Sequence, residues 1–339
     1  MALKDVIGQG EAIAILERAI ENQRYPHAYL FTGEEGVGKR LTALNVAKAL
    51  NCNSPVQFDA CDQCVSCSMA EKRLHPDIIF VEPEVGKDHE QKKEITVEQL
   101  RELEERIARR AFTGGKKVVI VNGAEKMNRF AANSMLKTLE EPPPDTLIIL
   151  ITTSPYALLP TIVSRCQQVR FAILKGSDIY RILIKLGYEG KDAQLLSSVS
   201  CGKVGYALSM DANDFRYRMA DFLKTLSIIN PINSSYRAMF SKAEELSKSQ
   251  QALDGFIERG MLWFRDLMIF KSTGKFELVM NLESKENISM EDASLDEIIA
   301  SLRLLYNTER ISALNLNRRL AVEVLFLRLL TIMEKGYGC

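Results

Sequence analysis

Residues 28–40 read AYLFTGEEGVGKR, a short apolar run followed directly by a glycine-rich turn. The apolar run predicts a buried strand, and the residues that follow the turn have a helical pattern. Gly33, Gly36 and Gly38 let backbone N–H groups face a phosphate, and the N-terminus of the helix favours negative charge. In loops of this type the lysine, here Lys39, reaches the β and γ phosphates. The stretch therefore predicts a P-loop, a phosphate-binding turn between a strand of a parallel sheet and a helix.

The positions that should hold Mg²⁺ carry the wrong chemistry. A working P-loop places Ser or Thr after the lysine to bind the metal, whereas this chain has Arg40, a permanent cation that cannot be a ligand. The acidic pair expected after the strand at 118–121 is replaced by Asn122 and Gly123. Because phosphoryl transfer depends on positioning and on charge neutralisation by the metal, we expect no ATP hydrolysis. Passive nucleotide binding stays open, and so does turnover with a displaced carboxylate such as Glu125.

The order of apolar patterns predicts how the 339 residues are organised. Up to residue 171, short apolar runs alternate with helical patterns, which is typical of an α/β domain with a mostly parallel sheet. The five predicted strands are 28–32, 78–82, 118–122, 147–152 and 168–171. Short helical patterns separated by glycines then predict a small helical lid, and long amphipathic patterns follow. We expect an α/β P-loop domain at 1–171, a lid at 172–213 and an all-helical domain at 214–339.

The overall charge excludes a strongly basic nucleic-acid binder. Lys and Arg number 44, and Asp and Glu also number 44, so any contact with DNA must be local or shared with partners. The first eight residues contain an acid and no apolar core of a secretory signal. Apolar stretches of four or five residues are far shorter than the roughly 20 that span a bilayer. We expect a cytoplasmic protein that does not enter a membrane.

Four of the seven cysteines lie close together in the sequence, at Cys52, Cys61, Cys64 and Cys67. Two overlapping C-x2-C steps supply the tight turns that place thiolates around a tetrahedral metal ion. A redox role for one C-x2-C pair is the main alternative. A fourth thiolate favours structural Zn²⁺, because four protein ligands leave no open position for a catalytic water. The cysteines at 166, 201 and 339 are isolated, and we expect them to fill space in the fold.

Residues 131–143 read AANSMLKTLEEPP, and residues 152–155 and 164–166 read TTSP and SRC. These segments resemble the clamp-loader branch of the AAA+ family. Upstream, VIGQ at 6–9 resembles the adenine-side box of these proteins, and the four cysteines resemble the zinc module of bacterial clamp-loader subunits. The resemblance covers residues 5–171 and, more weakly, 315–327. It implies an AAA+ fold whose C-terminal helices form an oligomerisation collar.

The departures from the motor subunits of that family are specific. Subunits of the gamma or tau type keep the Ser or Thr after the lysine, the acidic pair and a sensor arginine. This chain has Arg40, Asn122 and Gly123 at the first positions and Gly205 at the last. The resemblance therefore implies a ring member of the bacterial DNA polymerase III clamp loader that does not hydrolyse ATP. An active motor subunit and a zinc-binding adaptor outside replication remain the alternatives.

The resemblance also assigns a role to Arg165 in the SRC segment. In this family that arginine reaches across a subunit boundary into the nucleotide site of the neighbour. An arginine finger supplied in this way stabilises the charge on the transferred phosphoryl group. The implied partners are the gamma- or tau-type ATPase subunits, the delta subunit and, through the complex, a sliding clamp. Primed DNA would be contacted weakly or indirectly, because the chain carries no net charge.

Overall fold

The computed structural model describes residues 2–83, 94–113, 115–229, 235–281, 293–312 and 317–336. The chain forms two compact units, one of residues 1–182 with 201–206 and one of residues 183–200 with 207–339. Residues 172–213, predicted as a separate lid, are thus shared between the two units, and the three-part division remains a prediction. The predictions for Cys339 and for the first two residues of the segment 315–327 lie outside the described residues.

A five-stranded parallel sheet forms the centre of the first unit. Its strands are β1 (Ala28–Thr32), β2 (Ile78–Val81), β3 (Lys117–Asn122), β4 (Thr146–Thr152) and β5 (Gln167–Arg170). They lie in the order β2-β3-β4-β1-β5, and every pair is parallel. The central strands β1 and β4 are buried throughout, as expected for a parallel sheet covered on both faces. The predicted α/β fold and all five predicted strands are confirmed.

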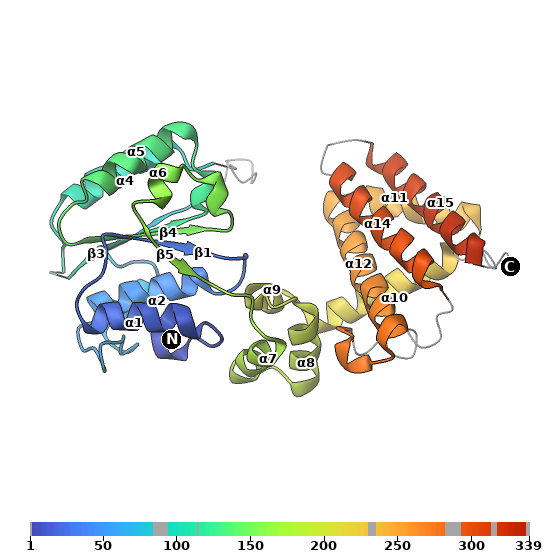
Figure 1. Cartoon of the computed structure of the whole chain (residues 1–339), viewed down its shortest axis with the longest axis horizontal. Coiled ribbons are helices and arrows are strands. Elements are labelled where there is room, and N and C mark those ends of the chain that lie inside the picture. Colours follow the sequence, from blue (N-terminus) through green and yellow to red (C-terminus); the bar gives the residue numbers. More distant parts are fainter. Residues whose placement is uncertain are drawn as a thin grey trace. The chain divides into compact units, whose positions relative to one another are not determined.

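Helices cover both faces of this sheet (Figure 1). The helices of the unit are α1 (Gly10–Glu21), α2 (Lys39–Asn51), α3 (Val65–Glu71), α4 (Val97–Ala108), α5 (Arg129–Glu140) and α6 (Pro160–Val163). Helices α1 and α2 lie on one face, and α4, α5 and α6 lie on the other. Leu30 and Ile148 face the α4–α5 side, where they join one apolar cluster. Strand alternation places Phe31 on the opposite face, where its ring centroid is 5.0 Å from that of Phe171.

The strand register gathers the candidate nucleotide-site residues at one edge of the sheet. Thr32 pairs with Thr152, and Asn122 pairs with Ile151, so β1, β3 and β4 end side by side. Short 3₁₀ turns follow two of them, η2 (Ala124–Lys126) after β3 and η3 (Pro155–Ala157) after β4. A third 3₁₀ turn, η1 (Leu3–Asp5), opens the chain. Ligands of open parallel sheets bind at the carboxyl ends of the strands, so this edge is where a nucleotide would sit.

Helices alone make up the described part of the second unit. They are α8 (Gly190–Val199), α10 (Ala212–Ile229), α11 (Tyr236–Ser247), α12 (Gln250–Thr273), the 3₁₀ turn η4 (Phe276–Leu278), α14 (Leu295–Ser312) and α15 (Arg318–Gly336). Two further helices, α7 (Gly176–Lys185) and α9 (Val204–Ser209), span the division between the units. The long helices confirm the amphipathic patterns after residue 213. Over the described residues, none has the length and apolarity needed to cross a bilayer.

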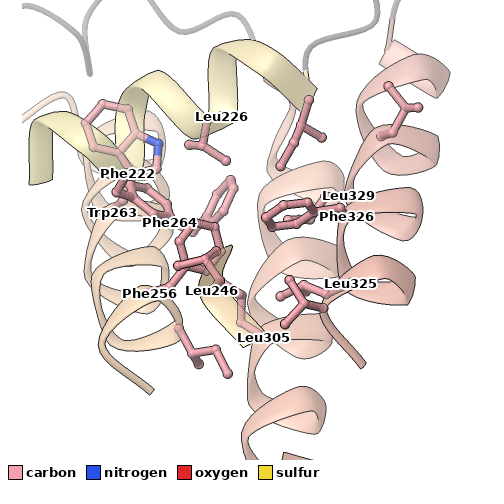
Figure 2. Packing of buried hydrophobic residues seen from close by; sticks show 14 of the residues in the cluster. Phe222, Leu226, Leu246, Phe256, Trp263, Phe264, Leu305, Leu325, Phe326 and Leu329 are labelled. Carbon is pink, nitrogen blue, oxygen red and sulfur yellow. The ribbon is translucent and has the colours of Figure 1, made fainter. Parts of the chain in front are cut away.

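Aromatic rings fill the core of the second unit (Figure 2). The Phe256 ring lies between Phe222 and Phe326, with centroid distances of 5.1 Å and 5.6 Å. Gly260 lets α12 approach α14 closely, because a Cβ there would lie 2.9 Å from a methyl carbon of Leu305. Each buried aromatic side chain removes a large apolar area from water. The unit is therefore stabilised by tertiary packing of its helices.

Candidate functional site

The P-loop backbone has the geometry that its glycines predict. Gly33, Gly36 and Gly38 have φ values of 144°, 77° and 100°, a region that residues with a side chain rarely adopt. A Cβ on Gly33 would also clash with the carbonyl oxygen of Phe171. Helix α2 begins at Lys39, directly after the loop. The strand, the glycine turn and the helix N-terminus are thus arranged as the sequence predicts.

The loop lysine binds its own loop. Lys39 Nζ donates to the carbonyl oxygens of Gly33 at 2.5 Å and Glu34 at 2.6 Å. The side chain is buried, and burial lowers its pKa, while Glu125, Glu35 and Glu34 oppose that shift. In a working P-loop this ammonium reaches the phosphates. Here a phosphate would have to displace two short hydrogen bonds.

A segment of the same unit lies against the loop. The Gly205 N–H donates to the Gly36 carbonyl at 2.8 Å, and Lys203 Nζ lies 3.3 Å from a Glu34 carboxylate oxygen. A Cβ on Gly205 would come within 2.9 Å of Gly36 Cα, so the close approach requires glycine there. In the clamp-loader subunits of the gamma or tau type described above, the position of Gly205 carries a sensor arginine. The structure has a backbone contact in its place.

The two substituted metal positions meet at one carboxylate. Arg40 Nε lies 3.3 Å from Glu82 Oε1, and the Asn122 amide donates to the same oxygen at 3.4 Å. Arg73 pairs with the other oxygen, Oε2, at 3.3 Å. Sequence reasoning treated Arg40 and Asn122 as separate defects and missed Glu82. Its position at the end of the predicted strand 78–82, at the same sheet edge, is the signal that points to it.

Glu125, named from the sequence as an example of a displaced carboxylate, interacts electrostatically with Lys39 of the loop. Its Oε1 accepts a hydrogen bond from Thr153 Oγ1 at 3.0 Å, and its buried Oε2 has no hydrogen-bond partner among the described residues. Burial alone would raise the pKa of Glu125, but hydrogen bonds from Thr152 and Thr153 outweigh it and the pKa is lowered. The carboxylate is therefore an anion that stabilises the Lys39 charge. Glu125 follows Asn122 and Gly123 in the chain and does not occupy either position of the expected acidic pair.

The four predicted cysteine ligands come together. Their sulfur atoms lie within 4.8 Å of one another, with Cys52 Sγ 3.9 Å from Cys64 Sγ and 3.7 Å from Cys67 Sγ. A tetrahedral ion with metal–sulfur bonds of about 2.3 Å separates its ligands by about 3.8 Å. The cluster thus fits a metal, and the remaining described cysteines, Cys166 and Cys201, lie outside it.

Backbone N–H groups point at the sulfur atoms of the cluster. The Cys61 N–H donates to Cys52 Sγ at 3.3 Å, and the Cys64 and Cys67 N–H groups donate to the sulfurs of Cys61 and Cys64 at 3.4 Å. Burial would raise the pKa of Cys64, yet N–H groups including that of Cys67 lower it to about 6. Hydrogen bonds from Gln63 and Cys64 likewise lower the pKa of Cys61. Burial instead raises the pKa of Cys52 and of Cys67. Thiolate is the form that binds a metal, so the backbone N–H groups favour coordination at Cys61 and Cys64.

A buried serine joins the two ligand segments, and a buried histidine contacts that serine. Ser66 Oγ, between two of the cysteines, donates to the Asn51 carbonyl at 2.5 Å and lies 3.1 Å from His75 Nε2. The Asp77 N–H donates to His75 Nδ1 at 3.2 Å, so the proton of the neutral ring is on Nε2. Burial lowers the pKa of His75. Sequence reasoning considered His75 only as a metal ligand and therefore missed this contact with Ser66.

Arg165 lies two residues after the C-terminal end of α6. Its NH1 donates to the Thr161 carbonyl at 3.0 Å, and its NH2 lies 2.8 Å from Glu140 Oε1. The side chain is 36% exposed, and neither contact involves the described P-loop residues 33–39. The structure therefore brings the P-loop residues together and the cysteines together, and it pairs Arg165 with Glu140, a residue that sequence reasoning missed.

Comparison with known proteins finds similarity to subunits of DNA polymerase III. The family model described as DNA polymerase III, delta subunit, matches residues 8–175. The chain is 44% identical over 145 residues to the DNA polymerase III subunit delta' of Pseudomonas aeruginosa, covering 43% of each protein. It is 34% identical over 223 residues to that of Bacillus subtilis, covering 66% of this chain and 65% of the relative.

A tau subunit of DNA polymerase III is also among the relatives. The tau subunit of Bacillus subtilis is 26% identical over 299 residues, covering 82% of this chain and 52% of tau. The chain thus spans less than two thirds of the length of each of these three relatives. The family-model match over residues 8–175 nevertheless includes the P-loop region, the cysteine cluster and the SRC segment that carried the resemblance. The chain belongs to the family of DNA polymerase III clamp-loader subunits that includes the delta' proteins.

Proposed function

We propose that this chain is a non-hydrolysing clamp-loader subunit of a bacterial DNA polymerase III holoenzyme, which helps to load a sliding clamp on primed DNA in the cytoplasm. The convergence of Arg40 and Asn122 on Glu82 carries the proposal. An amide and a guanidinium at these positions leave Mg²⁺ without its two usual protein anchors. The hydrogen bonds from Lys39 to its own loop support the same conclusion.

A working ATPase is the competing function, and Glu125 is the observation that favours it. This residue is an anion next to Lys39, with one buried oxygen that accepts no hydrogen bond from the described residues. Turnover would require this carboxylate to hold the metal or orient water without a Ser or Thr at position 40. Mg²⁺-dependent hydrolysis by the purified chain distinguishes the two functions.

We assign Arg165 the role of an arginine finger that acts on the ATP of a neighbouring gamma- or tau-type subunit. Its partly exposed guanidinium on a well-packed turn supports this role. In the complex with motor subunits, Arg165→Ala should leave assembly intact and lower the DNA-stimulated ATPase. Fingers of this kind contribute about 10³ to 10⁵ in rate at the site they serve. Undiminished ATPase in a fully assembled complex would refute the role, and Arg165→Lys tests whether charge alone is sufficient.

We propose that the four cysteines hold one structural Zn²⁺. Sulfur separations of 3.7 Å and 3.9 Å and four thiol ligands support a closed tetrahedral site. Metal analysis of protein purified with reductant should find about one zinc ion per chain. Cys64→Ser should lose the metal, whereas Cys201→Ser, outside the cluster, should retain it. Metal-free wild-type protein that is fully folded would contradict the assignment.

The partners follow from the family and from the charge of the chain. We expect contacts with gamma- or tau-type subunits and with the delta subunit, and a contact with the clamp through the complex. Zero net charge supports at most a weak, local contact with DNA. A zinc-binding adaptor outside replication would purify with other partners, so affinity purification of the full chain separates that alternative.

A further inference from the structure

Glu140 and Arg165 come from different segments and meet at one surface of the first unit. Glu140 is the last residue of α5, and Arg165 follows the short helix α6. The distance from Arg165 NH2 to Glu140 Oε1 is 2.8 Å, and both side chains are partly exposed. A second nitrogen of the same guanidinium, NH1, donates to the Thr161 carbonyl at 3.0 Å. Two contacts therefore fix the plane of the guanidinium.

The position of Glu140 is unfavourable for the helix that carries it. The C-terminus of a helix carries the negative end of the dipole and prefers cations, yet α5 ends on Glu140 and is followed by Glu141. Pro142 to Pro144 already prevent the helix from continuing, so no acid is required to end it. A residue that breaks a local rule often has a role elsewhere, and here the partner is Arg165.

The backbone on both sides of Arg165 is anchored. Ile162 is fully buried, and Cys166 packs against the same apolar cluster. The remaining freedom of Arg165 lies in its long side chain, and restricting its rotamers costs conformational entropy. Because the guanidinium has five N–H donors, contacts with Glu140 and Thr161 leave others available for a phosphate. The ion pair can thus orient the group in advance without consuming it.

We propose that Glu140 is a positioning residue for Arg165: it holds the guanidinium in the orientation in which it enters the nucleotide site of the neighbouring subunit. This inference rests on the proposed finger role of Arg165. Glu140 itself touches no nucleotide and acts through the arginine. Because the orientation is present before assembly, less side-chain entropy is lost when the finger engages.

The test uses the assembled complex with motor subunits and measures DNA-stimulated ATP hydrolysis. Glu140→Gln should lower kcat about two- to fivefold, the scale of one partly exposed ion pair, with KM unchanged. Glu141→Gln is the matched control, because it removes the same charge one residue away, and it should leave kcat unchanged. In an Arg165→Ala background, Glu140→Gln should have no further effect on kcat, because the arginine through which Glu140 acts is then absent.

The outcomes separate this inference from the function on which it rests. If Arg165→Ala leaves the ATPase of the complex unchanged, the finger role itself fails. If Arg165→Ala lowers kcat but Glu140→Gln matches Glu141→Gln, only the positioning role is overturned. An increase in kcat for Glu140→Gln would also overturn it, since Glu140 would then restrain the arginine. Size-exclusion chromatography of each complex shows that assembly is equal.

Discussion

Arg40, Arg73 and Asn122 surround Glu82 at the edge of the sheet where the P-loop lies. A divalent ion needs free anionic or hydroxyl oxygens, and the oxygens of Glu82 are already approached by Arg40, Arg73 and Asn122. The positive charges of Arg40 and Arg73 at this edge of the sheet also repel Mg²⁺. Arg40 and Asn122, which stand where metal ligands are expected, therefore also contact the carboxylate of Glu82.

At the residue scale, the buried imidazole of His75 should make the free energy of unfolding depend on pH. In the fold its pKa is lowered by burial, so the unfolded chain binds the proton first, and the fold loses stability as the pH falls through about 6.5. Protonation would also turn Nδ1 into a donor facing the Asp77 N–H. Urea unfolding of the full chain between pH 7.5 and 5.5 should show this loss.

The variant His75→Gln isolates the contribution of the imidazole. It should cost about 1 kcal/mol at pH 7.5 through weaker hydrogen bonding with Ser66, and the acid-dependent loss should become smaller. Zinc release also depends on pH through the thiols, so the zinc content is measured on the same samples. An identical pH dependence in the variant and the wild type would rule out His75 as its source.

At the scale of elements, α15 has apolar residues on both its inner and its outer face. Leu325, Phe326 and Leu329 are buried in the core of the second unit, and Figure 2 shows them pointing into it. On the outer face Leu320 and Leu327 are 57% and 38% exposed. Apolar residues at such helical spacing are typical of a face that packs against another helix. The face supports the proposal that this unit contributes to a collar of subunits.

Two variants of α15 separate assembly from folding. Leu320→Lys should change the free energy of unfolding by no more than about 0.5 kcal/mol, because the side chain is exposed, but should weaken assembly with motor subunits. Leu325→Ala removes a buried side chain and should cost about 2–5 kcal/mol. Urea unfolding and size-exclusion chromatography measure the two effects. Normal assembly of Leu320→Lys would exclude this face from the interface.

At the scale of the whole molecule, local sequence patterns predicted the helices and strands but did not predict the long-range side-chain contacts. The strand runs, the P-loop glycines and the cysteine spacing are signals within a few residues, and the structure confirms the strands and brings the cysteines together. The pairings of Glu82 with Arg40 and of Glu140 with Arg165 join residues 42 and 25 positions apart. They depend on strand order and on side-chain rotamers, which no local pattern encodes.

The grouping of the short helices after the sheet also depends on long-range contacts. Glycines at 187 and 202 marked turns correctly, and both have positive φ values. Whether a short helix packs with the sheet or with the helical unit depends on tertiary contacts, and residues 183–200 group with the helical unit whereas 201–206 group with the sheet. The end of the strand pattern at residue 171 does not indicate which unit each of these segments joins.

The most direct test of the account is ATP turnover by the purified full chain with Mg²⁺, in the absence of other subunits. We predict no hydrolysis above the background of a Lys39→Ala control, because Arg40 and Asn122 provide no metal ligands. Adding motor subunits and primed DNA should produce hydrolysis that depends on Arg165. Mg²⁺-dependent hydrolysis by the chain alone that Lys39→Ala abolishes would contradict the account.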